Sequence, residues 1–315
     1  MNLRSGHVIA SAVAATMAIA ALSACSSSGS GSAQTTSAAG TTASATGQSS
    51  AASIQVDATA RALLPASFRT SGTVTLATDA SSPPNEFVGP DGHTIEGFDP
   101  DLARAVFARL GLKVNFINAS FDTIIPGLES GKYDVGWSSH TDTAAREKVV
   151  TFVDYMNLGA SFITLPSGGK TVQGFSDLCG LAVAAEAGTT EYADATAQVT
   201  KCTQAGKTKP TIQVYPDDNA LVLAIVSQRA EVGMLNQAIA AYQAKQHGQI
   251  EVTGKPFDLA PAGAIVANKN AQLAQAILAG LKDIVADGQY GSILAKWGVS
   301  DAALKPAINI TGSGS

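Results

Sequence analysis

The 315-residue sequence has little charge of either sign and no cluster of basic residues. Charged residues make up 14% of the chain, and the formal net charge is −5. Proteins that bind nucleic acid neutralise the backbone phosphates with grouped Lys and Arg side chains. The composition therefore argues against nucleic acid as a partner.

The sequence also lacks the short motifs that mark common catalytic and cofactor sites. It contains no P-loop, no glycine-rich dinucleotide fingerprint, no H-E-x-x-H pair and no C-x-x-C pair. The four histidines are scattered, and none has metal-ligand spacing from another histidine or cysteine. We therefore expect no catalytic residue, no metal and no cofactor.

No apolar run is long enough to span a membrane as a helix. The run at residues 8–22 has about 15 residues, whereas a span needs about 20. It follows Arg4 and ends in Leu-Ser-Ala-Cys at residues 22–25, which resembles a bacterial lipobox. We expect residues 1–25 to be a lipoprotein signal peptide, with Cys25 lipidated on the outer face of the cell membrane. A plain secretory signal cut after Ala24 is the alternative.

The expected export affects how two other features are interpreted: the segment that follows the signal peptide, and the two remaining cysteines. Residues 26–55 consist mostly of Ser, Gly, Thr, Ala and Gln, a composition typical of a disordered tether. If Cys25 carries lipid, Cys179 and Cys202 remain, and an exported protein can join them in a disulfide. Two buried thiols are the other possibility.

From residue 74 onward, short strand-like runs alternate with helical runs. Asp99 is the expected N-cap of a helix over 97–112, Pro100 its first residue, and another helix begins near Thr143. Such alternation predicts an α/β protein with a mainly parallel sheet flanked by helices, in two units of similar size. The expected strands are 74–78, 113–117, 133–137, 181–185, 211–215, 231–235 and 262–268. The expected helices are 97–112, 121–131, 190–199, 219–228, 237–246, 271–287 and 289–297.

Hydroxyl side chains and one arginine follow the strand at 133–137. Ser139 and Thr141 are two residues apart, so in extended chain they face the same way. Arg146 lies close behind them, and a guanidinium can hold a carboxylate through two parallel hydrogen bonds. This pattern indicates a small-anion site, whereas an ion pair of Arg146 with Glu147 or Asp142 on a solvated surface is the alternative.

A second candidate element follows the strand at 181–185. Thr189 and Thr190 stand at the start of a predicted helix, where unpaired N–H groups and the helix dipole favour an anion. Simple N-capping is the alternative. One element comes from each α/β unit, so an anion bound between the units could contact both.

Several ordered blocks resemble the extracellular solute-binding proteins of family 3, the polar amino acid binders of ABC importers. The blocks include GFDPDLARAVFARLGLKVNF, FDTIIPGLESGKYDVGWSS, TDTAAREKVVTFVDY, GLAVAAEAGTTEY and VADGQYGSILAKWGV, between about residues 72 and 299. The resemblance implies a two-lobe periplasmic-binding-protein fold of type II. Lobe 1 would comprise 56–160 and 257–305, and lobe 2 would comprise 161–256. The crossovers would lie near 158–163 and 254–260, with a flexible tail at 306–315.

The resemblance also implies roles for individual residues. Arg146 of the T-x-x-R motif would hold the ligand carboxylate, assisted by Ser139 and Thr141. Thr189 and Thr190 would contact the same carboxylate from lobe 2. Phe121 would pack over the ligand. Cys179 and Cys202 resemble a disulfide pair of some members.

Three positions depart from the family pattern. Ser82 and Asn85 stand where the family carries aromatic residues, so one wall of the site is missing or is replaced by Phe87. We count Ser82 among the ligand-binding residues. Asn236 stands where the family carries the acid that pairs with the ligand ammonium, and an amide accepts a weaker hydrogen bond than a carboxylate does. His140 is expected to point away from the pocket.

The sequence therefore predicts a monomeric substrate-binding lipoprotein that captures an amino acid or related small carboxylate by hinge closure and delivers it to ABC permease subunits. One alternative is an enzyme on the same fold, resembling cyclohexadienyl dehydratase. That enzyme would need an acid or base in the cleft, and the candidates Glu86 and Glu186 are expected on the surface. The other alternative is a ligand-sensing lipoprotein without a transporter.

Overall fold

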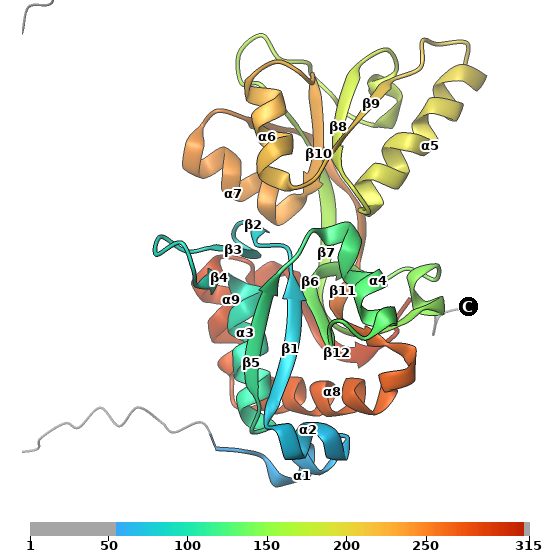
Figure 1. Cartoon of the computed structure of the whole chain (residues 1–315). Helices are drawn as coiled ribbons and strands as arrows, with labels where there is room; N and C mark the ends of the chain where they lie inside the picture. The colour runs from blue at the N-terminus through green and yellow to red at the C-terminus, as the bar shows by residue number, and fades with distance from the viewer. Residues whose placement is uncertain (1–54, 312–315) are drawn as a thin grey trace, which may run out of the picture. The chain divides into compact units, whose positions relative to one another are not determined.

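Two long antiparallel strands, β7 (Val150–Thr164) and β11 (Glu251–Ala267), connect two lobes in this computed structural model, which describes residues 55–311. Figure 1 shows both strands passing from the lower lobe, lobe 1, into the upper lobe, lobe 2. The β7–β11 register shifts between Thr253 and Phe257 and again between Phe257 and Ala260. These irregular pairings lie where the strands leave one lobe for the other.

Lobe 1 is built on three parallel strands and the helices that connect them. The strands are β1 (Thr73–Thr78), β5 (Lys113–Asn118) and β6 (Val135–Thr141), and the helices are α3 (Phe98–Arg109) and α4 (Phe121–Ser130). β1 lies between β5 and β6, and β11 pairs antiparallel with β6. Since parallel neighbours align their carboxyl ends, the ends of β1 and β6 face lobe 2 together.

Lobe 2 repeats this plan with the middle of the chain. Its parallel strands are β8 (Ala182–Glu186), β9 (Thr211–Tyr215) and β10 (Val232–Asn236), with β8 in the centre. Its helices are α5 (Thr190–Gln204), α6 (Asp218–Val226) and α7 (Gln237–His247). β10 pairs antiparallel with β7, which places lobe 2 on the far half of the crossover strands. The predicted α/β fold with two crossovers is thereby confirmed.

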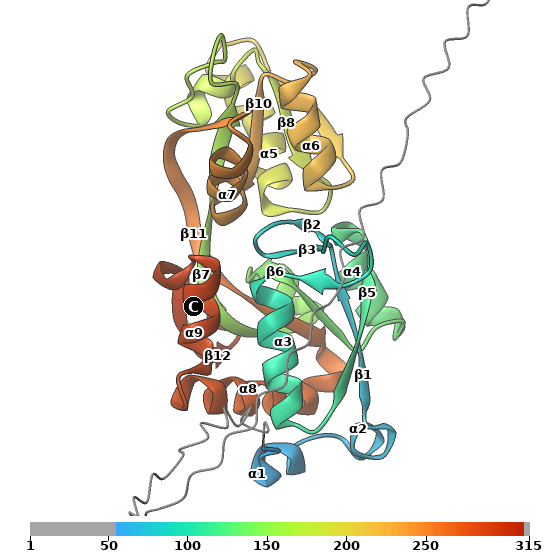
Figure 2. The same cartoon turned by 90° about the vertical axis from the view of Figure 1, so that its left-hand side faces the viewer.

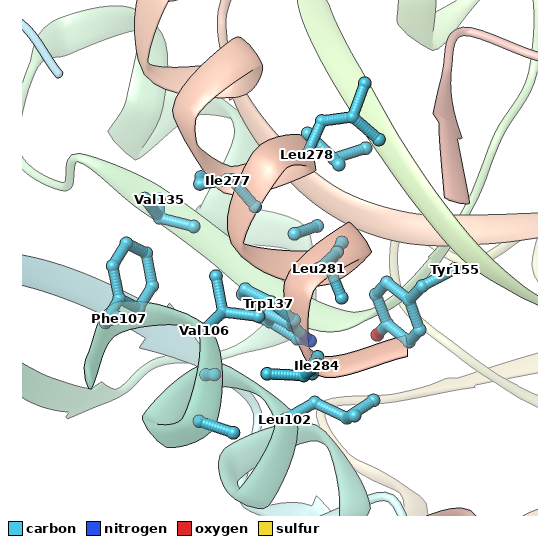
Figure 3. Packing of buried hydrophobic residues seen from close by; sticks show 14 of the residues in the cluster. Leu102, Val106, Phe107, Val135, Trp137, Tyr155, Ile277, Leu278, Leu281 and Ile284 are labelled. Carbon is cyan, nitrogen blue, oxygen red and sulfur yellow. The ribbon is translucent and has the colours of Figure 1, made fainter. Parts of the chain in front are cut away.

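The remaining elements complete lobe 1. After β11 has brought the chain back to lobe 1, helices α8 (Ala271–Ala286) and α9 (Gln289–Trp297) pack beside α3 (Figure 2). Trp137 lies at the centre of this core, between Phe107 and Tyr155, with Leu102, Leu281 and Ile284 nearby (Figure 3). The smaller elements are α1 (Ala58–Ala62), α2 (Ala66–Ser71), β2 (Ser81–Ser82), β3 (Glu86–Val88), β4 (Ile95–Glu96) and β12 (Ala303–Ile308). Residues 55–311 also contain short 3-10 turns at Arg146–Lys148, Phe175–Leu178, Asn268–Asn270 and Ser300–Ala302.

Three local expectations differ from the structure. The segment expected as a flexible tail from residue 306 begins inside β12, which pairs antiparallel with β7. The helix expected near Thr143 is only a 3-10 turn at Arg146–Lys148. Asp99 is not the N-cap of α3: the cap is Gly97, and Asp99 lies inside the first turn with its side chain buried.

The expectations for residues 1–25 and Cys25 lie outside the described residues, as does nearly all of 26–55. Within residues 55–311, no helix is long and apolar enough to cross a membrane.

A disulfide joins Cys179 to Cys202 and ties the start of β8 to α5 in lobe 2. Cys202 is fully buried. Because the two cysteines are bonded, the alternative of two buried thiols is not what the structure shows. The bridged residues are 23 apart in sequence, so the bond removes loop-closure entropy from the unfolded chain.

We predict that Cys179→Ala with Cys202→Ala lowers the free energy of unfolding by roughly 3 kcal/mol, since a loop of this size is stabilised by about that amount. Urea unfolding monitored by circular dichroism measures the change. Reducing the wild type with dithiothreitol should reproduce it. Equal stability of the wild type, the reduced wild type and the double variant would contradict the prediction.

Candidate functional site

A cavity lies between the lobes, where the ends of β6 and β8 and the starts of α5 and α7 meet. The cavity together with the open solvent at its mouth spans about 480 Å³. The residues that line it are Ser82, Asn85, Glu86, Phe121, Ser138, Ser139, Thr141, Arg146, Glu186, Thr189, Thr190, Glu191, Asp218, Met234, Leu235, Asn236 and Ile239. All eight residues expected to bind a ligand are in this set, and their role in binding stays a prediction.

Arg146 is held in place by main-chain carbonyls from both lobes. Its Nη1 donates to Thr141 O at 2.8 Å, and its Nη2 donates to Gly188 O at 2.9 Å. These bonds use two of the five guanidinium N–H donors, which leaves donors for an anion in the cavity. The expected alternative, a surface ion pair with Glu147 or Asp142, is not the arrangement seen. Burial lowers the pKa of Arg146, whereas the negative charges of Glu191 and Asp142 act to raise it.

Phe121 forms an aromatic stack beside the arginine. Its ring lies 4.5 Å from the His140 ring in a near-parallel stack, and the guanidinium carbon of Arg146 lies 5.7 Å from its centroid. His140 is fully buried behind Phe121 and does not line the cavity, as expected. Burial, together with the Arg146 charge, lowers its pKa well below the usual value, so the imidazole is neutral.

Phe87 does not replace the missing aromatic wall. Its ring packs edge-on against Trp297 in lobe 1, at 5.8 Å between centroids, and it does not line the cavity. Ser82 and Asn85 do line it. Where the family pattern has aromatic rings, this cavity therefore has hydroxyl and amide groups.

Lobe 2 presents helix starts whose side chains already cap their own helices. Thr189 Oγ1 accepts from Tyr192 N at 3.1 Å and donates to Glu186 O at 2.8 Å. Asn236 Oδ1 accepts from Ala238 N at 3.0 Å. Thr189 and Asn236 thus cap their helices and also line the cavity. The N-terminal turn of α5 faces the cavity.

Further hydrogen bonds show that the two lobes are in contact around the cavity. Ser82 Oγ donates to Asp218 Oδ2 at 2.8 Å, and Asp218 N donates to Ser81 Oγ at 3.3 Å. Gly188 lies so close to α4 that a Cβ added to it would be 2.8 Å from Asp122 Cα. The described residues therefore adopt a closed arrangement.

Asp99 fixes the conformation of Ser139 from the lobe 1 core. Ser139 has a φ of 48°, in the left-handed region that costs energy for a residue with a Cβ. Asp99 Oδ2 accepts from Ser139 N at 2.7 Å and from Ser139 Oγ at 2.9 Å. Asp99 Oδ1 accepts from Tyr155 OH at 2.5 Å. The carboxylate thus offsets the strain and orients the serine.

Sequence reasoning missed this role because Asp99 looked like a helix cap. One signal was available: Asp99, Leu102 and Val106 share one face of α3, and that face is buried. An acid on an apolar face needs donors nearby. Those donors come from Ser139 and Tyr155, which are 40 and 56 residues away along the chain.

Four carboxyl groups line the cavity, and the sequence did not indicate this. Glu86 and Glu186 were expected on the surface, yet they are only 2% and 5% exposed. Glu191 and Asp218 lie in the same wall. Burial, reinforced by Asp218 and Asp79, raises the pKa of Glu186 to about 12. Burial likewise raises the pKa of Asp218 to about 7. Among residues 55–311, no group of acids, histidines and cysteines could hold a metal ion.

A model of the bacterial extracellular solute-binding proteins, family 3, matches residues 74–300. The chain belongs to this family. A curated relative of this solute-binding protein is the arginine-binding protein ArgT of Corynebacterium glutamicum, 28% identical over 250 residues, covering 79% of this chain and 81% of that one. The glutamine-binding protein GlnH of Bacillus subtilis is 28% identical over 221 residues, covering 68% and 77%.

Solved structures of arginine-binding proteins share the fold of this family member. An ancestral arginine-binding protein bound to arginine matches with a TM-score of 0.65 and 30% identity, covering 72% of this chain and 98% of that one. A P235GK mutant of ArgBP from T. maritima matches with a TM-score of 0.66 and 26% identity, covering 73% and 97%.

We predict that Asp99→Asn weakens ligand binding by this solute-binding protein at least tenfold, because an amide cannot accept from both donor groups of Ser139 and from Tyr155. It should also cost about 1–3 kcal/mol of stability. Isothermal titration and urea unfolding give the two values.

Tyr155→Phe is the matched control, since it removes only the donor to Asp99 Oδ1. We expect it to lower stability by about 1 kcal/mol while the affinity stays within a few fold. If both variants weakened binding equally, Asp99 would not act through Ser139.

Proposed function

We propose that the cavity binds an amino acid whose α-carboxylate pairs with Arg146. The observation that carries this proposal is the guanidinium of Arg146, fixed by carbonyls of both lobes beside the hydroxyl of Thr141. A positioned guanidinium with spare donors suits a carboxylate, which accepts two parallel bonds. The N–H groups of the N-terminal turn of α5 add donors from lobe 2, whereas the Thr190 hydroxyl donates to Glu191 Oε2 at 3.0 Å.

Acceptor groups for an ammonium lie in the same cavity. Asn85 Oδ1 and Glu86 Oε2 are buried and accept no hydrogen bond from the described residues. Ser139 Oγ donates to Asp99, so toward a ligand it can serve only as an acceptor. Asn236 keeps one lone pair beyond its capping bond. These acceptors support an amino acid over a simple carboxylate, although the family acid is replaced by Asn236.

Hinge closure is the capture mechanism that the arrangement supports. The ligand docks on lobe 1 through Arg146, Ser139, Thr141 and Phe121, and lobe 2 then adds Thr189, Thr190 and Asn236. Only contacts present in the closed state can drive closure, and the Arg146–Gly188 and Ser82–Asp218 bonds are of this kind. The closed monomer then delivers its ligand to ABC permease subunits, and capture needs no cofactor. Relatives named as arginine-binding and glutamine-binding ABC transporter proteins support this role.

Export with a lipid anchor at Cys25 belongs to the same proposal. The lipobox-like residues 22–25 support it. Replacing Cys25 by Ser should move the exported protein from the membrane fraction to the soluble fraction of a bacterial host, as immunoblotting would show. A variant that stays with the membrane, like the wild type, would contradict the anchor.

An enzyme on the same fold is the second candidate, and a specific observation favours it. Glu186 is buried in the cavity with a raised pKa, which is the state that a general acid requires. A solved ancestral amino acid-binding protein, described as a precursor of cyclohexadienyl dehydratase, is 29% identical with a TM-score of 0.64. Incubation with prephenate or arogenate separates the two functions, and the receptor proposal expects the substrate to remain unchanged.

We predict that Arg146→Ala raises the dissociation constant for the bound amino acid at least 100-fold, because a desolvated charge pair is worth about 2–5 kcal/mol. Arg146→Lys should fall between wild type and Arg146→Ala, since an ammonium cannot make the two parallel bonds. Thermal-shift screening of amino acids followed by titration calorimetry measures both.

The control is Arg229→Ala, which removes an exposed arginine of lobe 2 that bonds only locally to Ser227 through its side chain. It should leave the affinity unchanged. Ligands that lack a carboxylate and bind Arg146→Ala as well as wild type would overturn the proposal.

A further inference from the structure

Three residues that follow β12 contact both the crossover strand β7 and the turn after β6. Ile310 N donates to Asp154 Oδ2 at 3.0 Å, and Thr311 N donates to Asp142 Oδ2 at 3.2 Å. The Thr311 hydroxyl donates to Asp142 O at 3.2 Å. We call residues 309–311 the strap. The strap lies outside the set of residues that line the cavity between the lobes.

The position of the strap is fixed by its own backbone and by β12. Asn309 has a φ of 47°, in the left-handed region that asparagine tolerates better than most residues. Its Oδ1 accepts from Phe152 N at 2.7 Å, which continues the antiparallel pairing of β12 with β7. The strap therefore has a defined place beside β7, and it reaches Asp142 from there.

Asp142 and Asp154 are buried acids that depend on the strap for donors. They are 2% and 0% exposed. Oδ2 of each accepts a main-chain N–H of the strap, whereas Oδ1 of each is buried and accepts no hydrogen bond from the N–H and hydroxyl groups of residues 55–311. The two carboxyl groups lie within hydrogen-bonding contact, so a proton on one of them can bond to the other.

Asp142 stands at the centre of the turn that holds Arg146. Thr141 O accepts from Arg146 Nη1 at 2.8 Å, and Thr143 Oγ1 accepts from Arg146 N at 3.2 Å. Asp142 N donates to Pro261 O, on β11, at 2.8 Å. The turn is thus held by β11 and by the strap. A displacement of Asp142 would move the two neighbouring threonines that orient the arginine.

We propose that the strap is a positioning element for ligand binding: through Asp142, Thr311 holds Arg146 where its guanidinium can pair with the ligand carboxylate. This inference rests on the proposed function, because it takes Arg146 as the anchor of that carboxylate. The strap itself does not touch the ligand. It keeps the guanidinium in the geometry that two parallel hydrogen bonds require, and that geometry tolerates little misplacement.

The strap should also respond to pH, because it is built on two acids. The groups that act on Asp142 are Asp154, Glu147 and the Arg146 guanidinium; Asp142 and Glu147 act on Asp154, and the strap has no titratable side chain. Burial, reinforced by the charge of Asp154, raises the pKa of Asp142 to about 7, and burial raises the pKa of Asp154 to about 6. The ordinary value is about 4. Protonation therefore stabilises the strap fully below about pH 4, and this contribution is lost as pH rises through about 6 to 7.

We expect Thr311→Pro to raise the dissociation constant about tenfold, which corresponds to roughly one net hydrogen bond. Proline removes both the N–H and the hydroxyl that bind Asp142. Thr311→Ser is the matched control, since it keeps both groups and should bind like wild type. Titration calorimetry with L-arginine and L-glutamine measures the affinities, because relatives are named for these amino acids. Circular dichroism checks that the variants are folded.

The same substitution in an Arg146→Lys background shows whether the strap acts through the arginine. A lysine ammonium makes no pair of parallel bonds that needs alignment, so Thr311→Pro should change the dissociation constant there by less than about twofold. A tenfold loss in both backgrounds would mean that the strap supports the fold as a whole, and it would overturn the inference.

Asp142→Asn tests the carboxyl pair without altering the strap, and it serves even if Thr311→Pro does not fold. The amide is a neutral acceptor for Thr311 N and a donor to Asp154 at every pH. Between pH 5.5 and pH 8.0 the wild type should lose about fivefold more affinity than the variant does. The comparison removes the effect of Asp218 in the cavity, whose pKa is also raised to about 7 and which both proteins carry. Identical pH profiles would overturn the role of the carboxyl pair.

The outcomes separate this inference from the proposed function. If Thr311→Pro binds as tightly as wild type while Arg146→Ala loses binding, the strap has no positioning role and the amino acid receptor stands. If the wild type binds no amino acid, both proposals are overturned.

Discussion

The closed structure depends on a guanidinium placed between two lobes. Arg146 reaches from the turn after β6 to Gly188 O, just before α5, so the proposed anchor of the ligand also makes a contact between the lobes. Gly188 accommodates this approach because it has no Cβ and a φ of +79°. The proposed function therefore couples recognition to closure, because a ligand held by Arg146 would lie where lobe 2 closes onto lobe 1.

The site is made rigid by groups that the ligand need not touch. Asp99 sits in the lobe 1 core and holds Ser139 in a strained conformation, and Tyr155 holds Asp99. Tyr155 in turn packs on Trp137, at the centre of the hydrophobic core. Energy gained by burying that core thus supports a local backbone strain at the cavity, which is a common arrangement at binding sites.

Sequence patterns were enough to predict the fold and to find the arginine and several of the hydroxyl residues that line the cavity. The alternation of strand and helix follows from local periodicity, and Arg146, Thr141 and Thr189 stand next to strand ends that the pattern located. The acids were not found in this way. Glu186 ends a buried strand, and Glu86 lies in a short strand. The sequence around either residue does not reveal that the opposite lobe covers it.

The same limit explains the other differences. Asp99 obeys the rule for a helix cap, but its donors lie on β6 and β7, far along the chain. The segment after residue 303 has no strong periodicity, yet it pairs with β7, and Ile310 N and Thr311 N donate to the buried carboxyls of Asp154 and Asp142. The positions of Asp99 and of the C-terminal segment depend on contacts between residues far apart in the sequence. Local propensity does not predict such contacts.

A crystal structure of the protein with its bound amino acid tests the central claim most directly. The account predicts both oxygens of the ligand carboxylate at about 3 Å from the guanidinium nitrogens of Arg146, inside closed lobes. It is contradicted if the carboxylate lies elsewhere in the cavity, or if the ligand binds with Arg146 turned toward bulk solvent.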